Sequence, residues 1–311
     1  MKRRSREIVH VGRAGWLFLV GGTNDVIRQY RWTFGSWWRL RRWAELIEAR
    51  AARARSLGIR YVHVVVPEKL SVYDDRTDGL HYDPTKSPAR RLARRLSGSP
   101  AFLDLLGPMR AAREDGPPLF FRTDSHWSFD GCFLAYRLLM RACGAVVPPD
   151  LPERRRFEHE RVRDLGEKLP DRPPERASLC DIPRDAVRTY ANRLVESHEA
   201  AGRESQLHTG AHVVFRNDAP GVDPRTLMLF GDSYSHFAQI MLTGLLAESF
   251  RSVHFVWSSS LDWTHIEAVR PDLLVTEIAE RFMVRVPGDA YDVTGQRDAD
   301  VSADPEAVPP I

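Results

Sequence analysis

Residues 227–235, Leu-Met-Leu-Phe-Gly-Asp-Ser-Tyr-Ser, join a short apolar run to a polar turn. The apolar part, Leu227 to Phe230, has the composition of a buried strand, and Ser233 follows it within three residues. At the carboxyl end of a parallel strand, a side chain lies at the sheet edge where α/β proteins bind their ligands. The stretch therefore predicts a parallel sheet with Ser233 at its ligand-binding edge.

Strand and helix patterns alternate along the rest of the chain. Apolar and β-branched runs predict strands, and apolar residues spaced three to four apart predict helices. Alternation with apolar strands predicts an α/β fold whose mostly parallel sheet is covered on both faces. The predicted strands are 59–66, 119–121, 212–215, 226–230, 253–257 and 273–278, and the predicted helices are 37–57, one starting at Ser87-Pro88, one capped by Ser128 and one at about 235–248.

The length of 311 residues permits one large domain or two small ones. Residues 146–185 are rich in proline and charge, but strand signals resume after them. They therefore predict an excursion over the surface, not a linker between domains. The tail after about Pro287 lacks periodicity, which predicts disorder over residues 291–311. We expect a single domain over residues 1–290.

Composition excludes several classes of protein. With 43% apolar and 28% charged residues, the whole chain is not disordered, collagen-like or a coiled coil. A net charge of +3 gives no argument for a nucleic-acid partner, and we expect none. The start, residues 1–4, resembles the basic end of a signal peptide, but His10, Gly12 and Arg13 interrupt the apolar stretch that should follow. We therefore expect no signal peptide, which leaves cytoplasmic and exported locations open.

The sequence gives little support for disulfides or metals. Cys132 and Cys143 fall in one predicted helix, about 16 Å apart and beyond disulfide reach, so Cys180 can pair with only one of them. We interpret all three as core residues. His208 and His212 are four residues apart, but they lie in a loop that runs into a strand, without an acidic or Cys partner at ligand spacing. We expect no metal site and no cofactor.

Ser233 has a candidate base and a candidate carboxylate elsewhere in the chain. A serine hydroxyl becomes nucleophilic when a histidine takes its proton, and a carboxylate orients that histidine. Asp124 and His126 point to the same side of an extended segment between a predicted strand and a predicted helix. Such junctions share one edge of a parallel sheet, so we predict a triad of Ser233, His126 and Asp124. The alternative is that Asp232 or Ser233 caps the next helix, Asp124 caps its own turn and His126 lies on the surface.

Two further features belong to this hypothesis. The helix predicted from about residue 235 would direct its free N–H groups at Ser233, and the N–H of Ser233 itself is a candidate donor to an oxyanion.

Five segments carry a family resemblance. In chain order they are Gly12 to Leu19, Val66 to Lys69 with Val72-Tyr73, Thr123 to Trp127, Gly231 to Ser235, and Glu277 to Phe282. With these segments the chain is similar, from about residue 10 to 285, to the SGNH-hydrolase-like O-acetyltransferases of alginate biosynthesis, the AlgX/AlgJ type.

Aromatic side chains are candidates for stacking on the sugar rings of such a polysaccharide, although aromatics at helical spacing more often belong to a core. We assign Trp43 to the core and leave Trp37 and Trp38 open.

The resemblance implies a three-layer α/β/α domain in which the Asp and His precede the serine, a permuted order. It implies an acetyl group carried on Ser233 and passed to a hydroxyl of an exopolysaccharide in the periplasm, with a membrane acyltransferase partner as one source of acetyl. The candidate substrate-binding residues are Trp127, Tyr234, Lys69 and Arg281. For Trp127 a place in the core is the alternative, and for Lys69 we favour an ordinary surface charge. An acetyl esterase with the same triad and a non-catalytic sugar-binding protein are the rival functions.

Overall fold

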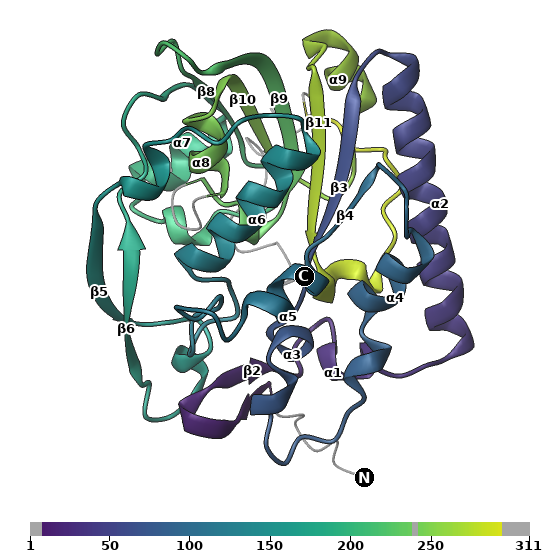
Figure 1. The fold of residues 1–311 in the computed structure, drawn as a ribbon, viewed down its shortest axis with the longest axis vertical. Coiled ribbons are helices and arrows are strands. Elements are labelled where there is room, and N and C mark those ends of the chain that lie inside the picture. The colour runs from purple at the N-terminus through teal and green to yellow at the C-terminus, as the bar shows by residue number, and fades with distance from the viewer. Residues whose placement is uncertain (1–7, 238–241, 294–311) are drawn as a thin grey trace.

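The computed structural model describes residues 8–237 and 242–293. Its centre is a seven-stranded sheet in the order β4-β3-β11-β9-β10-β8-β7 (Figure 1). The first five strands pair in parallel, and β8 and β7 add antiparallel pairs at one side, which confirms the mostly parallel sheet. The strands are β3 (Arg60–Val66), β4 (Phe102–Asp104), β7 (Val187–Ala191), β8 (His212–Arg216), β9 (Asp223–Gly231), β10 (Phe250–Trp257) and β11 (Leu273–Ala279).

Alternate side chains of the central strands enter two separate hydrophobic cores. On β9, Leu227 and Leu229 pack into the core under helices α6 (Phe129–Ala142) and α8 (Leu242–Ala247). Met228 and Phe230 pack into the core under α2 (Phe34–Ser56), α4 (Pro88–Arg95) and α9 (Trp263–Val269). Helices thus cover both faces of the sheet, as the alternation of apolar strands predicts.

Polar caps fix where the main helices begin. Helix α6 starts where the Ser128 hydroxyl accepts the N–H of Gly131, and α4 starts with Ser87 as cap and proline in the first turn. Gly131 is required there because a Cβ atom would lie 2.0 Å from the Leu119 carbonyl oxygen. Both caps were predicted from the sequence.

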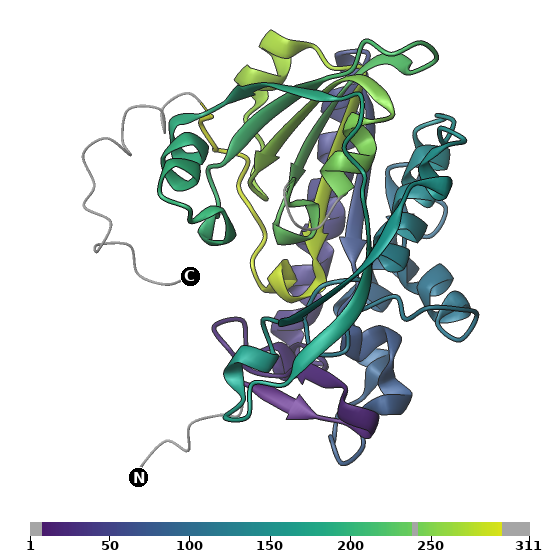
Figure 2. The ribbon, with the colours of Figure 1, turned by 90° about the vertical axis from the view of Figure 1, so that its left-hand side faces the viewer.

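The excursion over residues 146–185 contains more structure than its composition predicted. It forms an antiparallel hairpin of β5 (Arg156–Val162) and β6 (Pro174–Cys180), which runs alongside the sheet toward the N-terminal hairpin of β1 (Val9–Val11) and β2 (Leu17–Leu19) (Figure 2). Leu165, in the loop between β5 and β6, packs against Val9 and Leu17. The shorter helices are α1 (Val26–Gln29), α3 (Lys69–Val72), α5 (Leu106–Ala112) and α7 (Arg193–Ala200).

Two predicted elements differ from the structure. Residues 119–121 form no strand but a single bridge between Phe120 and Trp127, because the chain turns sharply there into α6. The helix predicted from about residue 235 is described from Leu242 (α8), and Ser233 itself lies in a one-turn 3-10 helix, Ser233–Ser235. The free N–H groups at Ser233 therefore belong to this 3-10 helix, which corrects the expectation that a longer helix supplies them.

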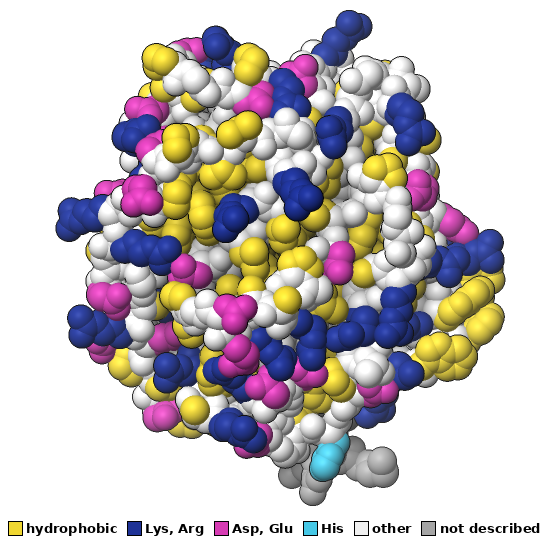
Figure 3. Space-filling view, in the orientation of Figure 1, with side chains coloured by type: hydrophobic (Ala, Val, Ile, Leu, Met, Phe, Trp, Pro, Cys, Tyr) yellow, Lys and Arg dark blue, Asp and Glu magenta, His cyan; other side chains and the backbone are white. Residues whose placement is uncertain are grey.

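Other expectations concern the cysteines, the surface and the termini. Cys132, Cys143 and Cys180 are buried free thiols, as predicted. Over residues 8–237 and 242–293, no helix combines the length and apolar character needed to cross a bilayer. Basic and acidic side chains are intermixed on the face shown in Figure 3. The predicted disordered tail lies, apart from its first residues, outside the described residues, and the single domain over residues 1–290 stays a prediction.

Candidate active site

Ser233 stands just past the end of β9, where Asp232 fixes the turn. One carboxylate oxygen of Asp232 accepts the N–H of Tyr234 at 2.9 Å, and the other accepts the N–H of Ala279, at the end of β11, at 2.7 Å. Asp232 is therefore the cap of the turn, one of the alternatives that the sequence left open. Because both of its oxygens are occupied by backbone donors, the neighbouring Ser233 hydroxyl is left to face another partner.

That partner is His126, which lies in the loop before α6. The Nε2 atom of His126 is 2.8 Å from Oγ of Ser233, and its Nδ1 atom is 2.8 Å from Oδ1 of Asp124. The same Asp124 oxygen accepts the N–H of His126 at 3.0 Å, which fixes backbone and ring together. With the Nδ1 proton donated to the carboxylate, Nε2 is free to accept the serine proton. The structure brings the three predicted residues into one hydrogen-bonded chain.

Burial and charge act in opposite directions on this histidine. Burial favours the neutral ring, but the hydrogen bond and the negative charge of Asp124, with a contribution from Asp164, outweigh it and raise the pKa of His126 above 6.5. Burial likewise favours the neutral form of Asp124, yet the hydrogen bond from His126 lowers the pKa of that carboxyl below its usual range. Asp124 is therefore ionised near neutral pH and stabilises the positive ring that forms when His126 takes a proton.

Comparison with known proteins identifies the family of the chain. Residues 9–265 match the family model described as the SGNH hydrolase-like domain of the acetyltransferase AlgX. The chain belongs to this family. A relative, the probable alginate O-acetylase AlgJ of Pseudomonas fluorescens, is 26% identical over 145 residues, which are 45% of this chain and 34% of AlgJ. The chain thus matches about a third of the length of that relative.

Solved structures of similar proteins show the same fold. The O-acetyltransferase domain of Pseudomonas putida AlgJ superposes with a TM-score of 0.55 at 16% identity, over 94% of this chain and 99% of that domain. Bacillus cereus PatB1 superposes with a TM-score of 0.58 at 14% identity, over 89% of this chain and 97% of PatB1. The SGNH-hydrolase-like fold expected for an AlgX-type chain is therefore confirmed.

Two carboxylates from the β5–β6 hairpin hold the His126 loop of this AlgX-family chain. Asp164 accepts the N–H of Ser125 at 2.7 Å and also its hydroxyl. Glu175 accepts the N–H groups of Arg122 and Thr123 and the hydroxyl of Thr123, each at 2.7 Å. Sequence reasoning missed both residues, because an Asp and a Glu in a charge-rich segment carry no signal that separates them from solvated neighbours.

We expect Glu175→Gln to loosen this loop. An amide keeps one acceptor oxygen for three donors, and a hydrogen bond to a charged group is worth about 1.5–3 kcal/mol. The free energy of unfolding should fall by about 1–3 kcal/mol, and turnover should fall with it. Denaturant titration and initial rates with an acetyl ester measure the two effects.

Glu158→Gln in the same hairpin is the matched control. Its carboxylate is half exposed and lies 3.7 Å from the Arg176 guanidinium, so it should change neither quantity appreciably. Equal behaviour of the two variants would contradict the anchoring role of Glu175.

Tyr234 and Trp127 are both buried beside the histidine. The Tyr234 hydroxyl donates to the carbonyl of Ser125 at 2.5 Å, and its ring centroid lies 4.8 Å from that of His126. Trp127 packs edge-on against Tyr234 at 5.1 Å and belongs to the core, the alternative that the sequence left open for it. Tyr234 thus packs against the imidazole ring and Trp127 packs against Tyr234, and a contact of either residue with substrate stays a prediction.

Lys69 is a buried residue, which corrects our expectation of a surface charge. Its ammonium donates to the carbonyls of Leu17, at 2.8 Å, and Arg122, at 3.1 Å, and burial lowers its pKa to about 8. Backbone carbonyls replace water around the charge, so the side chain is tolerated inside and ties β2 to the segment before Asp124.

Arg281 is also buried and lies close to the triad. Its Nη1 atom is 3.2 Å from Oε1 of Glu68, and its guanidinium lies 5.2 Å from the ring centroid of Tyr234. Its positive charge opposes protonation of His126 and so offsets part of the effect of Asp124. A role for Arg281 in holding substrate stays a prediction.

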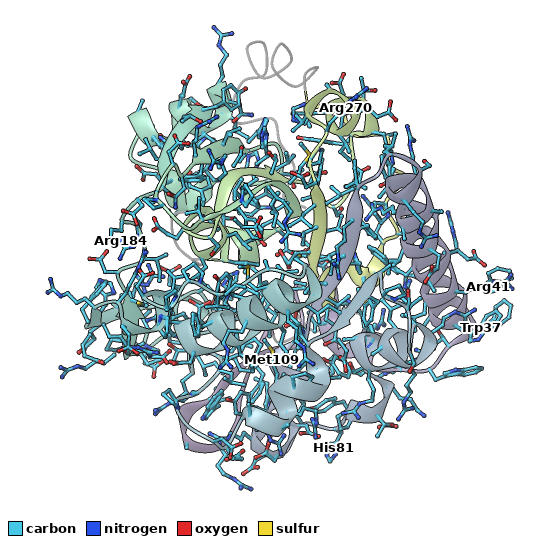
Figure 4. The ribbon with its side chains drawn as sticks, turned by 45° about the horizontal axis from the view of Figure 1, so that its top comes forward. Trp37, Arg41, His81, Met109, Arg184 and Arg270 are labelled. Atoms are coloured by element: carbon cyan, nitrogen blue, oxygen red, sulfur yellow. The ribbon has the colours of Figure 1, made fainter. Side chains whose placement is uncertain are left out.

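The tryptophans considered for sugar stacking occupy different environments. Trp43 is buried, as predicted, and its indole N–H donates to the carbonyl of Met283 at 3.0 Å. Trp37 and Trp38 lie at the start of α2 with ring centroids 5.5 Å apart, beside the exposed Phe34. Trp37 and Arg41 point outward from this helix (Figure 4). The two surface tryptophans are thus accessible, and their stacking on sugar stays a prediction.

Proposed function

We propose that this chain is an O-acetyltransferase that carries an acetyl group on Ser233 and passes it to a hydroxyl of an exopolysaccharide. The observation that carries the proposal is the hydrogen-bonded chain from Ser233 Oγ through His126 to Asp124. A serine, an imidazole and an ionised carboxylate in this order make a nucleophile with its own base. The AlgX family and the relatives named as alginate O-acetylases support acetyl as the group and a polysaccharide as the acceptor.

In the first half-reaction, Ser233 Oγ attacks the carbonyl carbon of the acetyl donor while its proton moves to His126 Nε2. The carbonyl oxygen becomes an oxyanion. The N–H of Ser233 is the donor we assign to it, since the first N–H groups of a helical turn have no intrahelical acceptor. The bond to the leaving group then breaks, and the proton on His126 moves to that group. The product is acetyl-Ser233.

In the second half-reaction, a sugar hydroxyl takes the place of the leaving group. His126 Nε2 removes the hydroxyl proton as the sugar oxygen attacks the acetyl carbon. Collapse of the second tetrahedral intermediate releases the acetylated sugar, and the proton returns from His126 to Ser233. Asp124 remains ionised throughout and stabilises the ring while it is positive.

The proposed acceptor and donor rest on the chemistry of the site and on the likeness to the AlgX family. Water performs the same second step as a sugar hydroxyl, so an esterase differs only in which acceptor reaches acetyl-Ser233. We propose an alginate-like acceptor because of the named relatives. We also propose that a membrane acyltransferase partner supplies the acetyl group, as the resemblance implies.

The test follows the acetyl group. The protein is incubated with an activated acetyl ester, with and without mannuronate oligosaccharides, and intact masses of protein and sugar are recorded. We expect acetyl-Ser233 without sugar and acetylated oligosaccharide with it. Acetate as the sole product in both cases would make the chain an esterase, and unreacted ester would leave the non-catalytic sugar-binding function.

A further inference from the structure

Three histidines from distant parts of the sequence meet beside the far strands of the sheet. His212 comes from β8, His254 from β10 and His265 from α9. One ring nitrogen of each lies within 4.8 Å of the others. None of the three belongs to the triad, and the proposed acetyl transfer makes no use of them.

Strand register explains why two of the rings share a face. In the antiparallel pair of β8 and β10, His212 is opposite Val256 and His254 is opposite Val214, so the histidines are two positions apart diagonally. Their neighbours Val213 and Phe255 point into the core on the other side of the sheet. His212 and His254 therefore both point to the side that α9 covers.

Helix α9 brings the third ring to this face. Asp262 caps the helix by accepting the N–H of His265 at 2.9 Å, which places His265 in its first turn. Ile266 of the same helix packs into the core that contains Val256 of β10. Caps and core packing thus fix the backbone of all three histidines before any ligand binds.

The chemistry of the cluster suits a transition metal. Three imidazole nitrogens are a donor set of zinc sites that keep a fourth position for water or another ligand, at Zn–N distances of about 2.0–2.1 Å. Such ligands select Zn²⁺, Cu²⁺ or Ni²⁺ over Mg²⁺ and Ca²⁺, which prefer oxygen. In the described part of the chain the buried Nδ1 atom of His254 has no hydrogen-bond partner, a costly state that a bound cation relieves.

We propose that His212, His254 and His265 bind one Zn²⁺ ion, which links β8, β10 and α9. The alternative without a metal is a cluster of packed aromatic rings. The centroids of the three imidazole rings lie 5.2–6.4 Å apart, and the ring centroid of Tyr190 lies 5.1 Å from that of His212. The proposal also replaces the pair of His208 and His212 that was considered from the sequence. His208 is exposed and packs against His198. The proposed partners of His212 are instead His254 and His265, which spacing along the chain does not indicate.

Zinc binding to the full chain, produced without a histidine tag and stripped with a chelator, tests the proposal. Isothermal titration with Zn²⁺ should give one equivalent, and the thermal unfolding midpoint should rise when the ion is added. Co²⁺ in its place should give the visible absorption of a tetrahedral site. No stoichiometric binding by the wild-type chain would overturn the proposal.

Three glutamine variants locate the site. His254→Gln and His265→Gln should each weaken Zn²⁺ binding by about 100-fold or more, because each removes a ligand. His208→Gln, an exposed histidine outside the cluster, should bind like the wild type. Circular dichroism shows whether each variant is folded. If one variant is not folded, the Co²⁺ spectrum of the wild-type chain still tests for the metal site. Equal binding by His254→Gln, His265→Gln and the wild type would place the ion elsewhere.

Discussion

Ser233→Ala is expected to reduce acetyl-ester turnover by about 10⁴- to 10⁶-fold and to leave the fold intact. Without the hydroxyl no acetyl-serine forms, and His126 has no proton to take. The change should cost little stability because Ser233 is only partly buried and the deleted group is a single hydroxyl, whose hydrogen bond is to His126. Initial rates with an activated acetyl ester and denaturant titration measure the two quantities, and the intact mass should show no acetylated protein.

Ser235→Ala, in the same turn, is the matched control. The Ser235 hydroxyl donates to the buried carboxylate of Glu277 at 2.8 Å. Without this hydroxyl, the same Glu277 oxygen keeps the N–H of Asp232 as a donor but loses the hydrogen bond from Ser235. This variant should lose about 1–3 kcal/mol of stability but retain the chemical step. Ser233→Ala should thus lose turnover and keep stability, whereas Ser235→Ala should lose stability and keep the chemical step. Near-normal turnover by Ser233→Ala would end the proposal of an acetyl-serine intermediate.

The parts of the site that depend on local sequence patterns could be predicted from the sequence. The apolar strand ending at Phe230 placed Ser233 at the carboxyl edge of the sheet, and the cap at Ser128 placed His126 just before a helix. The strand predicted over residues 119–121, which was to bring His126 to that edge, forms only a single bridge. The spacing of Asp124 and His126 placed their side chains together, and the structure has them 2.8 Å apart. The position of Ser233 needed only the rule that parallel strands end at a common edge, and the pairing of Asp124 with His126 needed only the alternation of side chains in an extended segment.

The β5–β6 hairpin was missed because it lacks that pattern. Most of its side chains are exposed, so no alternation of apolar and polar residues marks its strands. Its contribution to the site comes from Asp164 and Glu175, whose partners are backbone groups about 40 and 50 residues away in the chain. Contacts of this kind depend on tertiary structure, and residue type alone does not predict them.

Lys69 shows a different limit. A lysine is almost never fully buried unless it is paired, so the surface is the ordinary expectation. Here the backbone carbonyls of Leu17 and Arg122 supply the pairing. Similarly, the segment after Ser233 has helical composition, but it begins with a 3-10 turn that Asp232 caps, one carboxylate oxygen accepting the N–H of Tyr234 and the other the N–H of Ala279 on β11. Lys69 and the second oxygen of Asp232 both have backbone partners that lie far away in the sequence.

Asp124→Asn is expected to lower turnover by about 10⁴-fold with the fold retained. The amide can present its NH₂ group to Nδ1 of His126, and the ring then carries its proton on Nε2. In that tautomer the imidazole cannot accept the proton of Ser233. The amide also lacks the negative charge that stabilises the imidazolium formed during attack. The pH dependence of kcat/KM, which reports the free enzyme, separates these two effects.

The pH midpoint should move in a defined direction. The pKa of His126 is raised above 6.5, so wild-type activity should rise with pH and reach half its maximum above that value. Because the hydrogen bond and charge of Asp124 favour the protonated ring, Asp124→Asn should shift the midpoint of the residual activity to lower pH. Asp164→Asn should shift it the same way by less, since Asp164 contributes charge without a hydrogen bond to the ring. It should lower the rate much less than Asp124→Asn does, because it loosens the Ser125 anchor but leaves the hydrogen bond to His126 in place.

An unchanged rate together with an unchanged midpoint in Asp124→Asn would reduce Asp124 to a cap for the N–H of His126. Another carboxylate would then have to orient the ring. Asp232 is the nearest choice by sequence, but its oxygens accept the N–H groups of Tyr234 and Ala279. Asp164 has an oxygen within 4.8 Å of a His126 ring nitrogen, so Asp164→Asn would then be the variant that loses activity. The pair of asparagine variants therefore identifies the orienting carboxylate.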